Sequence, residues 1–320
     1  MLLEITKSGK VSGIVGHNVD YITIGDNPCL PEIIAEVFGW EAIQINFTTD
    51  SGEAISIGAC RKGQKIVLLP QFSYGPSLKQ VIAGELIQVL KKNGFVCEWR
   101  MTSKISEFTF TDKATTLIQL QSNPNLESQP FSSNLRRKIR KCASNKIKFK
   151  TGKSELIADF YGVYSRNMHR LGSPAQPIKW FLALIEKYGN GDAVICCAYL
   201  DEKAVGVAFM LEYQGFYEAC WVSTLDKYNK LYVSYGLYWE MIRFAIESNG
   251  VQFSFGRSTI DSGVHKFKQQ WGGLDVQLFW NYSHPQRKNI RKFTFLPKIW
   301  KVLPYKVAKH LGPVVSGWFY

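Results

Sequence analysis

The sequence predicts an α/β fold of the α+β kind, in which mixed, mostly antiparallel sheets are flanked by helices. This class follows from two similar runs of elements, each with strand-like segments, a helix and a further strand. The chain has 320 residues, of which 46% are hydrophobic and 20% charged, so it is long enough to bury two cores. We therefore expect two domains of related architecture.

The first half shows this pattern from its first predicted strand onward. Its strand-like segments lie at residues 42–47, 54–60, 65–69, 95–101 and 115–120. Between the third and fourth segments, a helix is expected at residues 77–92 and ends before Gly94. Its apolar stripe is formed by Val81, Leu86, Val89 and Leu90. Residues 121–129 are rich in Asn, Ser, Gln and Pro, which predicts a linker between the halves.

The second half shows the same pattern more clearly. Two helices are expected first, at residues 154–171 and 178–188. Three strands joined by short hairpin-like turns follow at residues 193–200, 204–212 and 216–223. A helix at residues 233–248 then leads into a strand at residues 251–255. This order of elements supports a second domain of the same plan as the first.

Three segments of the chain are predicted. They are two domains, residues 1–128 and 129–285, and a basic, aromatic C-terminal segment, residues 286–320. Glu4 interrupts the apolar part that a signal peptide needs, and no run of about 18 uncharged apolar residues predicts a spanning helix. We therefore expect a cytoplasmic protein, with the inner face of the membrane as the alternative location.

The net charge of +13 is concentrated in two segments. Residues 131–153 hold nine Lys and Arg, residues 284–320 hold eight, and neither segment contains an acidic residue. The rest of the chain holds 22 basic and 26 acidic residues, which is an ordinary balance. The excess charge therefore belongs to these two segments and not to the body of the protein.

The first basic segment contains a predicted amphipathic helix whose cations have no acidic partner within the segment. Its apolar stripe is formed by Leu135, Ile139, Cys142 and Ala143. A solvated helix face is one interpretation, but unrelieved like charges favour an anionic partner. Phosphates fit best, from a nucleotide-activated precursor, a tRNA or an acidic membrane surface. Candidate phosphate-binding residues are Arg137, Arg140 and Lys141.

The C-terminal segment combines cations with aromatic residues and prolines. Its aromatic residues include Phe293, Phe295, Trp300, Tyr305, Trp318, Phe319 and Tyr320. Such a stretch suits peripheral contact with a membrane surface, and it equally suits packing against the second domain. Both interpretations remain open from the sequence.

The motif Phe255-Gly256-Arg257-Ser258-Thr259, followed by Phe267-Lys268-Gln269-Gln270-Trp271-Gly272, is the strongest candidate site. It joins a predicted strand end to a glycine, two cations and hydroxyl groups. A sheet fixes the backbone at such a point while the following loop leaves side chains free to meet a ligand. The alternative is a simple turn followed by ordinary helical core spacing of two aromatic residues.

This motif resembles the closing motif of FemAB-related proteins, especially the type associated with exosortase and exopolysaccharide systems. That family belongs to the acyltransferase superfamily with the GNAT (acyl-CoA N-acyltransferase-like) fold. Further segments that resemble the family are Leu69-Pro70-Gln71-Phe72-Ser73-Tyr74-Gly75, residues 135–141, 160–174 and Leu237-Tyr238-Trp239. The resemblance implies tandem GNAT-like domains, of which the N-terminal one is degenerate and the C-terminal one catalytic.

The resemblance also implies an acyltransferase that moves an acyl or aminoacyl group onto an amine of a cell-envelope precursor, such as one for exopolysaccharide or peptidoglycan. Lys268 would stabilise the developing oxyanion, and Arg257 would anchor a phosphate or carboxylate of the acceptor. Substrate contacts are expected from Ser258, Asp261, Tyr238 and Trp271. No permanently bound cofactor is expected.

The stretch that precedes the predicted helix at residues 233–248 bears on the donor. Acetyl-CoA enzymes of the GNAT fold carry a glycine-rich turn there, whose N–H groups bind the pyrophosphate. Residues 230–236 contain one glycine among bulky residues. This favours an enzyme that uses aminoacyl-tRNA as donor. An acetyl-CoA-type N-acetyltransferase remains a second possibility, and a non-catalytic basic module that binds tRNA or anionic lipid is a third.

Other chemistries find little support in the sequence. No HExxH, P-loop or GxSxG motif occurs, and the seven cysteines show no CxxC spacing, so we expect reduced cysteines and no metal site. Cys196 and Cys197 are expected on opposite faces of a strand. Asp261 lies four residues before His265 and could orient that ring as a base, although a loop histidine in local hydrogen bonds is the more common case.

Overall fold

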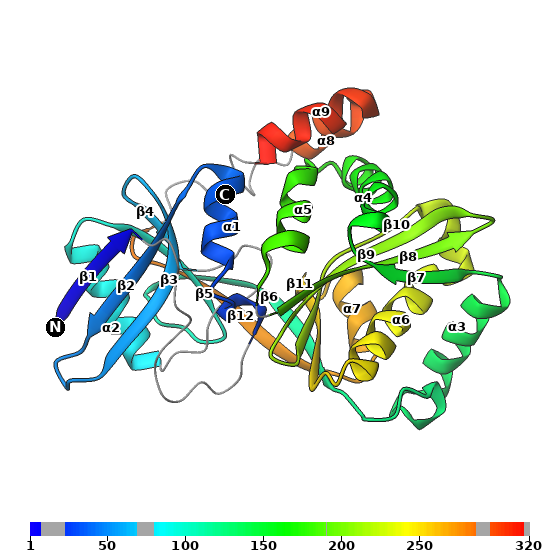
Figure 1. Ribbon diagram of the computed structural model, residues 1–320, viewed down its shortest axis with the longest axis horizontal. Helices are drawn as coiled ribbons and strands as arrows, with labels where there is room; N and C mark the ends of the chain where they lie inside the picture. The colour runs from blue at the N-terminus through cyan, green and yellow to red at the C-terminus, as the bar shows by residue number, and fades with distance from the viewer. Residues whose placement is uncertain (8–22, 69–79, 190, 286–294, 317–320) are drawn as a thin grey trace.

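The computed structural model describes residues 1–7, 23–68, 80–189, 191–285 and 295–316. Within these residues, the strands form one 12-stranded sheet in the order β1-β2-β3-β4-β5-β12-β6-β11-β10-β9-β8-β7. The sheet runs through both halves of the molecule (Figure 1). The predicted α+β class with flanking helices is therefore confirmed, but the two halves share one sheet instead of having one each.

The first half contributes six strands and two α-helices among the described residues. Their bounds are β1 Leu2–Lys7, α1 Leu30–Phe38, β2 Glu41–Thr48, β3 Ala54–Lys62, β4 Lys65–Val67, α2 Gln80–Lys92, β5 Val96–Met101 and β6 Phe108–Gln119. The predicted segment at residues 69–75 lies outside the described residues. The predicted linker contains a short 3-10 turn, Leu126–Ser128.

The second half begins with a basic helix and an edge strand. The bounds of its elements are α3 Ser133–Ser144, β7 Lys148–Gly152, α4 Ile157–Leu171, α5 Ile178–Lys187, β8 Gly191–Leu200, β9 Lys203–Tyr213, β10 Phe216–Thr224, α6 Val233–Glu247, β11 Gln252–Thr259, α7 Gly263–Gln269 and β12 Leu274–Tyr282. Two further helices follow, α8 Phe295–Val302 and α9 Tyr305–Ser316.

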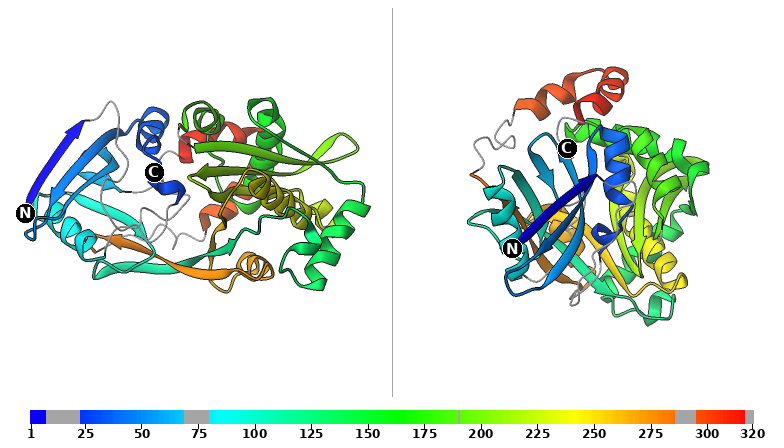
Figure 2. Two further views of the ribbon diagram at one scale, coloured as in Figure 1. Left: turned by 60° about the horizontal axis from the view of Figure 1, so that its bottom comes forward. Right: turned by 60° about the vertical axis from the view of Figure 1, so that its left-hand side comes forward.

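The two halves repeat one topology and exchange their last strands. In each half an antiparallel run ends in a parallel pair, β4 with β5 and β10 with β11, and a helix crosses between the paired strands. The strand that follows β5, which is β6, pairs with β11 of the second half, and β12, which follows β11, pairs with β5 of the first. Figure 2 shows β12 beside β6. The predicted boundary near residue 128 thus divides the sequence but not the sheet.

Helices cover both faces of the sheet. In the second half, α4 and α5 cover one face, and α6 and α7 cover the other, with α3 packed on the outside of α6 (Figure 1). The core on the α4 and α5 side includes residues of α1 and β12, so it joins the halves. Cys197 belongs to this core and Cys196 to the core on the α6 side, as their predicted opposite faces require.

Several predicted features differ from the structure. The motif residues from Gly256 to Thr259 lie within strand β11, because β11 pairs again with β6 after a shift in register between Ser254 and Arg257. Val81, predicted on the apolar stripe of α2, is 71% exposed. Ala143 of α3 is also exposed, whereas Leu135, Ile139 and Cys142 are buried as predicted.

Helix α3 lies close to α6, and Gly236 makes this approach possible. A Cβ atom on Gly236 would lie 2.5 Å from both Cys142 Sγ and Phe149 Cζ. Real Cβ atoms do not approach other atoms so closely, so any larger residue would push α3 and β7 away. This glycine is therefore required by the packing of α3 on α6.

We predict that Gly236→Ala destabilises the protein by about 1–3 kcal/mol, because the clash outweighs the better helix propensity of alanine. The matched control is Gly162→Ala in α4, where a Cβ atom would meet nothing within 4 Å. That change is expected to stabilise the fold by about 0.5–1 kcal/mol. Urea denaturation measures both effects, and equal changes in the two variants would contradict the packing argument.

Candidate active site

A pocket opens where the parallel strands β10 and β11 part. They pair from Phe216 with Gln252 to Glu218 with Ser254 and not beyond. Immediately after this point, β10 shifts register against β9 and β11 shifts register against β6. Gly256 has a φ of 67°, and a Cβ atom on it would lie 2.7 Å from the carbonyl oxygen of Ala219. Only glycine fits this crossing point.

The pocket between the parted strands has a volume of about 410 Å³. Its walls come from α4, α6, α7, the strands β10 and β11, and the end of α9. Aromatic and thioether side chains form much of the lining, namely Tyr164, Met168, Trp221, Tyr238 and Phe255. Arg257 and Lys268 are the cationic side chains in this lining. Polar and apolar groups contribute about equally to the lining, and cationic groups that converge beside aromatic side chains can fix the orientation of a ligand.

Lys268 reaches from α7 back to the parted strand β11. Its Nζ donates hydrogen bonds to the carbonyl oxygens of Gly256 at 2.6 Å and Arg257 at 3.1 Å. The side chain is only 4% exposed. Burial lowers the pKa of Lys268 from 10.5 to about 7; the nearby carboxylate of Glu218 raises that pKa and Arg257 lowers it. A lysine in this state changes charge near neutral pH.

Glu218 lies fully buried on β10 next to the pocket. Its Oε2 accepts a hydrogen bond of 3.0 Å from Ser254 Oγ, which also accepts one from the N–H of Gly256 at 3.1 Å. Ser254 Oγ lies 2.9 Å from Thr115 Oγ1 of β6. The sequence analysis missed this group of residues. A glutamate inside the apolar run of residues 216–223 was the available signal, because an acid is rarely fully buried without a partner.

Arg257 lies on β11 at the pocket wall, and its side chain is exposed. Its charge also acts on Glu98 of β5. Although burial raises the pKa of Glu98, Arg100, Lys65 and Arg257 together hold it below its usual value. Arg257 therefore adds positive potential to the mouth of the pocket and to the junction between the halves.

The structure places the other predicted contact residues differently. Tyr238 of α6 lines the pocket together with Arg257 and Lys268. Ser258 is buried beside the pocket and is not part of its lining, and Asp261 is exposed in the turn after β11. Trp271 is 1% exposed, with its ring against Phe255 and Tyr238. We therefore correct the expected role of Trp271 from substrate contact to core packing.

His265 is buried on α7 and lies outside the pocket lining. Its Nδ1 accepts a hydrogen bond of 3.1 Å from the backbone N–H of Asp261, and its Nε2 lies 3.1 Å from a carboxylate oxygen of Asp275. The alternative of orientation by the Asp261 carboxylate is not supported, because the ring contacts the backbone N–H of Asp261 and the carboxylate of Asp275. This geometry supports the interpretation that His265 is a structural histidine held by local contacts.

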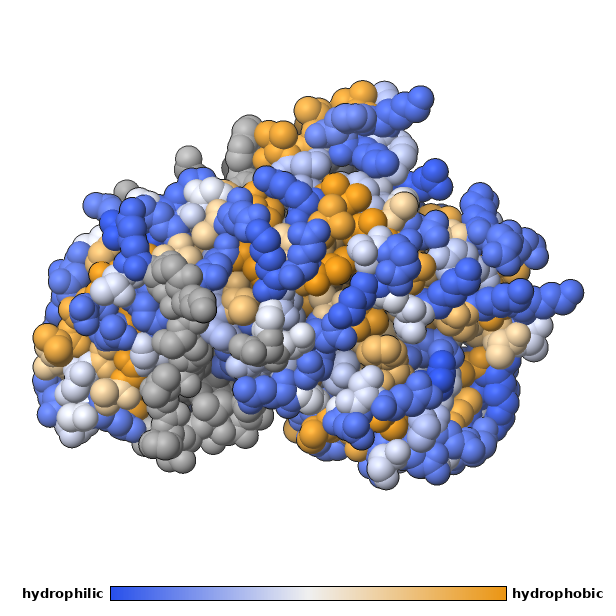
Figure 3. Space-filling model, in the orientation of Figure 1, coloured by the Kyte–Doolittle hydropathy of each residue, from blue (hydrophilic) through white to orange (hydrophobic). Residues whose placement is uncertain are grey.

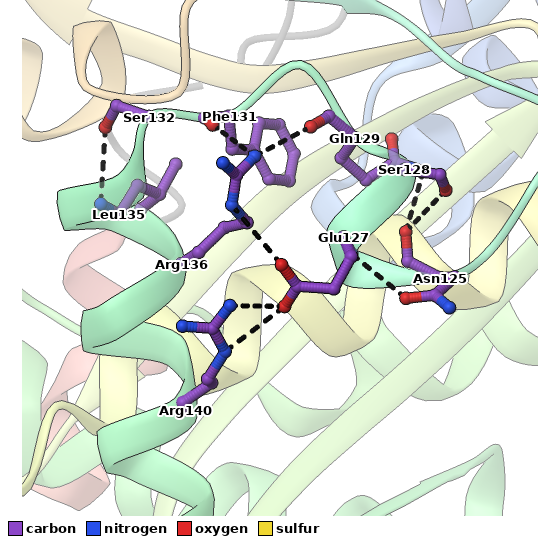
Figure 4. A network of polar contacts seen from close by, with 9 residues as sticks. All are labelled: Asn125, Glu127, Ser128, Gln129, Phe131, Ser132, Leu135, Arg136 and Arg140. Carbon is purple, nitrogen blue, oxygen red and sulfur yellow. Dashed lines mark hydrogen bonds and ion pairs between the residues drawn. The ribbon is translucent and has the colours of Figure 1, made fainter.

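The basic helix α3 does have an acidic partner, which lies just before the basic segment. Glu127 accepts hydrogen bonds from Arg140 and forms an ion pair with Arg136, as Figure 4 shows. Arg136 also donates to the carbonyl oxygens of Gln129 and Phe131, which ties the linker to the helix. The basic segment contains no acid, as the sequence shows, but two of its cations pair with an acid that precedes it.

The predicted phosphate-binding residues of α3 do not line the pocket. Arg137 and Lys141 are exposed on α3, whereas Arg140 is paired with Glu127. The pocket wall draws no residue from α3. These cations could therefore bind an anion only at a surface separate from the pocket.

The start of α6 is covered by α3 and the residues after it. Tyr232 adopts a left-handed conformation with φ 59° just before α6, and Asn145 donates a hydrogen bond to the carbonyl oxygen of Leu231. Lys141 lies over the ring of Tyr232. Gly236 serves the contact with α3 described above and does not form a phosphate-binding turn. This geometry agrees with the absence of the glycine-rich turn noted in the sequence.

Within the described ranges, no group of three or more His, Cys, Asp or Glu side chains could hold a metal ion. The seven cysteines are free thiols. Cys220 lines the pocket, and burial raises the pKa of its thiol well above the ordinary value, which makes it a poor nucleophile. Among the helices that the structure describes, none has the length and apolar character to cross a membrane.

Comparison with known proteins supports the fold. A model of the acetyltransferase (GNAT) domain matches residues 130–269. FemX is similar in structure, with 11% identity over 79% of this chain and 90% of FemX, and a TM-score of 0.59. No curated protein sequence matches the chain.

Two further solved structures have a similar fold. The C-terminal domain of a putative lysylphosphatidylglycerol synthetase from Agrobacterium fabrum shares 10% identity over 75% of this chain and 84% of that domain, with a TM-score of 0.54. L-PGS from Bacillus licheniformis shares 13% identity over 89% of this chain and 100% of L-PGS, with a TM-score of 0.52. The residues that line the pocket between β10 and β11 lie within residues 130–269, except Ser316. Residues 130–269 therefore match the model of a GNAT acetyltransferase domain, and the protein has the GNAT fold.

Proposed function

We propose that the protein is a Fem-like acyltransferase, which moves an acyl or aminoacyl group onto an amine of a cell-envelope or exopolysaccharide precursor. The observation that carries this proposal is the pocket between β10 and β11, because it brings the side chains of Lys268 and Arg257 together beside aromatic walls. Burial strengthens the electrostatic effect of Lys268 on a reacting group.

Acyl transfer to an amine needs two functions from these residues. The amine nitrogen bonds to the carbonyl carbon of an ester or thioester, the bond to the leaving group breaks, and the amine loses a proton. Lys268 in its charged form stabilises the negative charge that develops on the carbonyl oxygen. Arg257 anchors a phosphate or carboxylate of the acceptor at the pocket mouth, while the aromatic walls hold the acyl group near the amine.

Aminoacyl-tRNA is the donor that we favour over acyl-CoA. The covered start of α6 lacks a glycine-rich turn for a pyrophosphate, although acyl-CoA is the co-substrate typical of GNAT domains. The name of the lysylphosphatidylglycerol synthetase describes the attachment of a lysyl group to a lipid, which is an aminoacyl transfer. An acetyl-CoA-dependent N-acetyltransferase is the alternative donor class, and a non-catalytic module that binds tRNA or anionic lipid is the alternative to an enzyme.

We predict that Lys268→Met and Arg257→Gln each reduce transfer strongly, Lys268→Met by on the order of 10²-fold or more in kcat. Mass spectrometry of small molecules that copurify with the protein would identify the acceptor. Transfer to that acceptor is then measured with a mixture of aminoacyl-tRNAs and, separately, with acetyl-CoA. The rate should fall as pH rises through about 7, because Lys268 then loses its proton.

The matched control is Lys266→Met, which removes an exposed cation from the same helix. Its activity should equal that of the wild type. Transfer from acetyl-CoA alone would overturn the choice of donor but not the enzyme. Undiminished transfer in Lys268→Met and Arg257→Gln would overturn the site, and no transfer from either donor by the wild type would favour the binding module.

The protonation of Lys268 also predicts a change in stability that needs no substrate. The folded pKa lies at about 7, below the unfolded value, so the folded protein binds fewer protons than the unfolded chain between pH 7 and 10.5. The free energy of unfolding should therefore rise with pH in this window, by about 1 kcal/mol per pH unit from this group. Lys268→Met should lack this rise, as urea denaturation at several pH values would show.

The wild type and Lys268→Met contain the same tyrosines and cysteines, so their shared titration cancels in the difference between the two proteins. A difference in unfolding free energy that stays constant from pH 7 to 9.5 would mean that Lys268 keeps an ordinary pKa. Its charge would then persist throughout the neutral range, and the predicted fall in rate should vanish as well.

The exposed cations of helix α3 lead us to predict that the protein binds an anionic partner and that this binding weakens as the salt concentration rises. Arg137→Glu with Lys141→Glu should weaken binding of tRNA by roughly tenfold or more at low salt while the fold stays stable, since both side chains are exposed. Arg140→Gln is the control with a small effect, because Glu127 already pairs with Arg140. Filter binding across a salt series measures the affinity for tRNA. If all variants bind tRNA with the same affinity, the cations of α3 are only a solvated helix face.

A further inference from the structure

The outer face of α8 and α9 carries exposed apolar side chains together with cations. The exposed aliphatic residues are Ile299 at 52%, Val302 at 80%, Val307 at 43%, Leu311 at 45% and Val314 at 61%. The exposed lysines of the outer face are Lys298, Lys301 and Lys306, whereas the Nζ of Lys309 lies over the ring of Tyr161 on α4. Residues 295–316 contain no Asp or Glu. Figure 3 shows apolar and hydrophilic atoms side by side along this outer edge.

The inner face of α9 consists of small residues that pack against the second half. Ala308, Gly312 and Ser316 are buried at a spacing of four. A Cβ atom on Gly312 would lie 3.0 Å from backbone atoms of Ala175, so α9 sits directly on the segment after α4. Helix α9 therefore packs on the second half through its small residues, and the aliphatic residues of its outer face take no part in this packing.

Specific polar contacts hold α8 and α9 in place on α4. Tyr305 Oη lies 2.9 Å from Ser165 Oγ, and His169 Nε2 lies 2.8 Å from the carbonyl oxygen of Leu303. Figure 1 shows both helices at the outside of the molecule, above α4. The outer face therefore has a fixed orientation.

The outer residues of α9 form one stripe. Val307, Leu311 and Val314 are spaced by four and three residues, which places them on the same side of a helix. This side lies away from the buried small face, where a helix of a water-soluble protein normally carries polar residues. Contiguous apolar surface of this kind usually marks a binding surface.

We propose that the outer face of α8 and α9 binds the surface of an anionic lipid bilayer. The aliphatic side chains enter the boundary between headgroups and acyl chains, while the flexible lysines reach lipid phosphates. Helices that bind anionic bilayers combine exposed apolar residues with lysines. Helices α8 and α9 have both and contain no acidic residue.

Charge argues against a second copy of this chain as the occupant. A twofold interface brings the same surface together with itself, so the lysines of the two copies would face each other without any acidic partner from these helices. An anionic bilayer offsets the same charges. Ser316 at the end of α9 also lines the pocket, so bilayer binding would hold the pocket close to the membrane surface.

The test is co-sedimentation of the full chain with vesicles of phosphatidylcholine, with or without about one third phosphatidylglycerol. The wild type should bind the anionic vesicles and lose binding as salt rises. Lys298→Gln with Lys301→Gln should weaken this binding by roughly 30-fold at low salt. Val302→Ser with Leu311→Ser should weaken binding to anionic vesicles by roughly tenfold or more, including at high salt.

Helix α2 offers matched controls, because Val81 is 71% exposed and Lys92 is exposed near the end of the helix. Val81→Ser and Lys92→Gln should bind vesicles as the wild type does. Thermal melting checks that all variants fold. Equal binding by the α8 and α9 variants and the wild type would overturn the proposal. So would a concentration-dependent dimer that Val302→Ser with Leu311→Ser dissolves, since the face would then bind a second copy.

Discussion

The hydrogen bonds from Lys268 to the carbonyl groups of Gly256 and Arg257 hold the end of β11 against α7 at the point where β11 leaves β10. Two parted strands expose backbone groups that must find other partners. The Lys268 ammonium supplies donors for two of them, and Ser254 supplies another partner through the N–H of Gly256. The open pocket therefore depends on a buried charge, and that charge is balanced by Glu218 on the facing strand.

This arrangement links the stability of the pocket to its chemistry. Buried charges are costly to desolvate, and here the charge of Glu218 raises the pKa of Lys268 and so favours the charged lysine. The same burial lowers the pKa of Lys268, and it would strengthen the effect on a reacting carbonyl that we propose for this residue. Arg257 stays exposed at the mouth of the pocket, where a charged substrate can reach it.

Much of the fold was predictable, because strands such as β2, β3 and β8–β10 and the helices α4–α6 have clear apolar periodicity. The pairing of β12 with β5 was not predictable, because nothing in either strand specifies a partner so distant in sequence. Lys268 and Arg257, chosen from their place near a glycine, both line the pocket, and their roles stay predictions. Trp271 was misassigned and Glu218 was missed, because burial depends on which helix covers which face and local sequence does not reveal it. Glu127 was overlooked for a similar reason: it pairs with α3 from outside the basic segment.

The exchange of β6 and β12 has a consequence for how the chain reaches this fold. Met101 of β5 pairs with Phe279 of β12, and Ile118 of β6 pairs with Phe253 of β11, so both central pairings join residues far apart in sequence. During synthesis, the edges of β5 and β6 stay uncovered until nearly the whole chain has left the ribosome. Such non-local pairing slows folding and leaves strand edges open to wrong partners. The sheet of the first half is thus incomplete until β12 is present, and truncation before residue 274 would leave the edge of β5 exposed to aggregation.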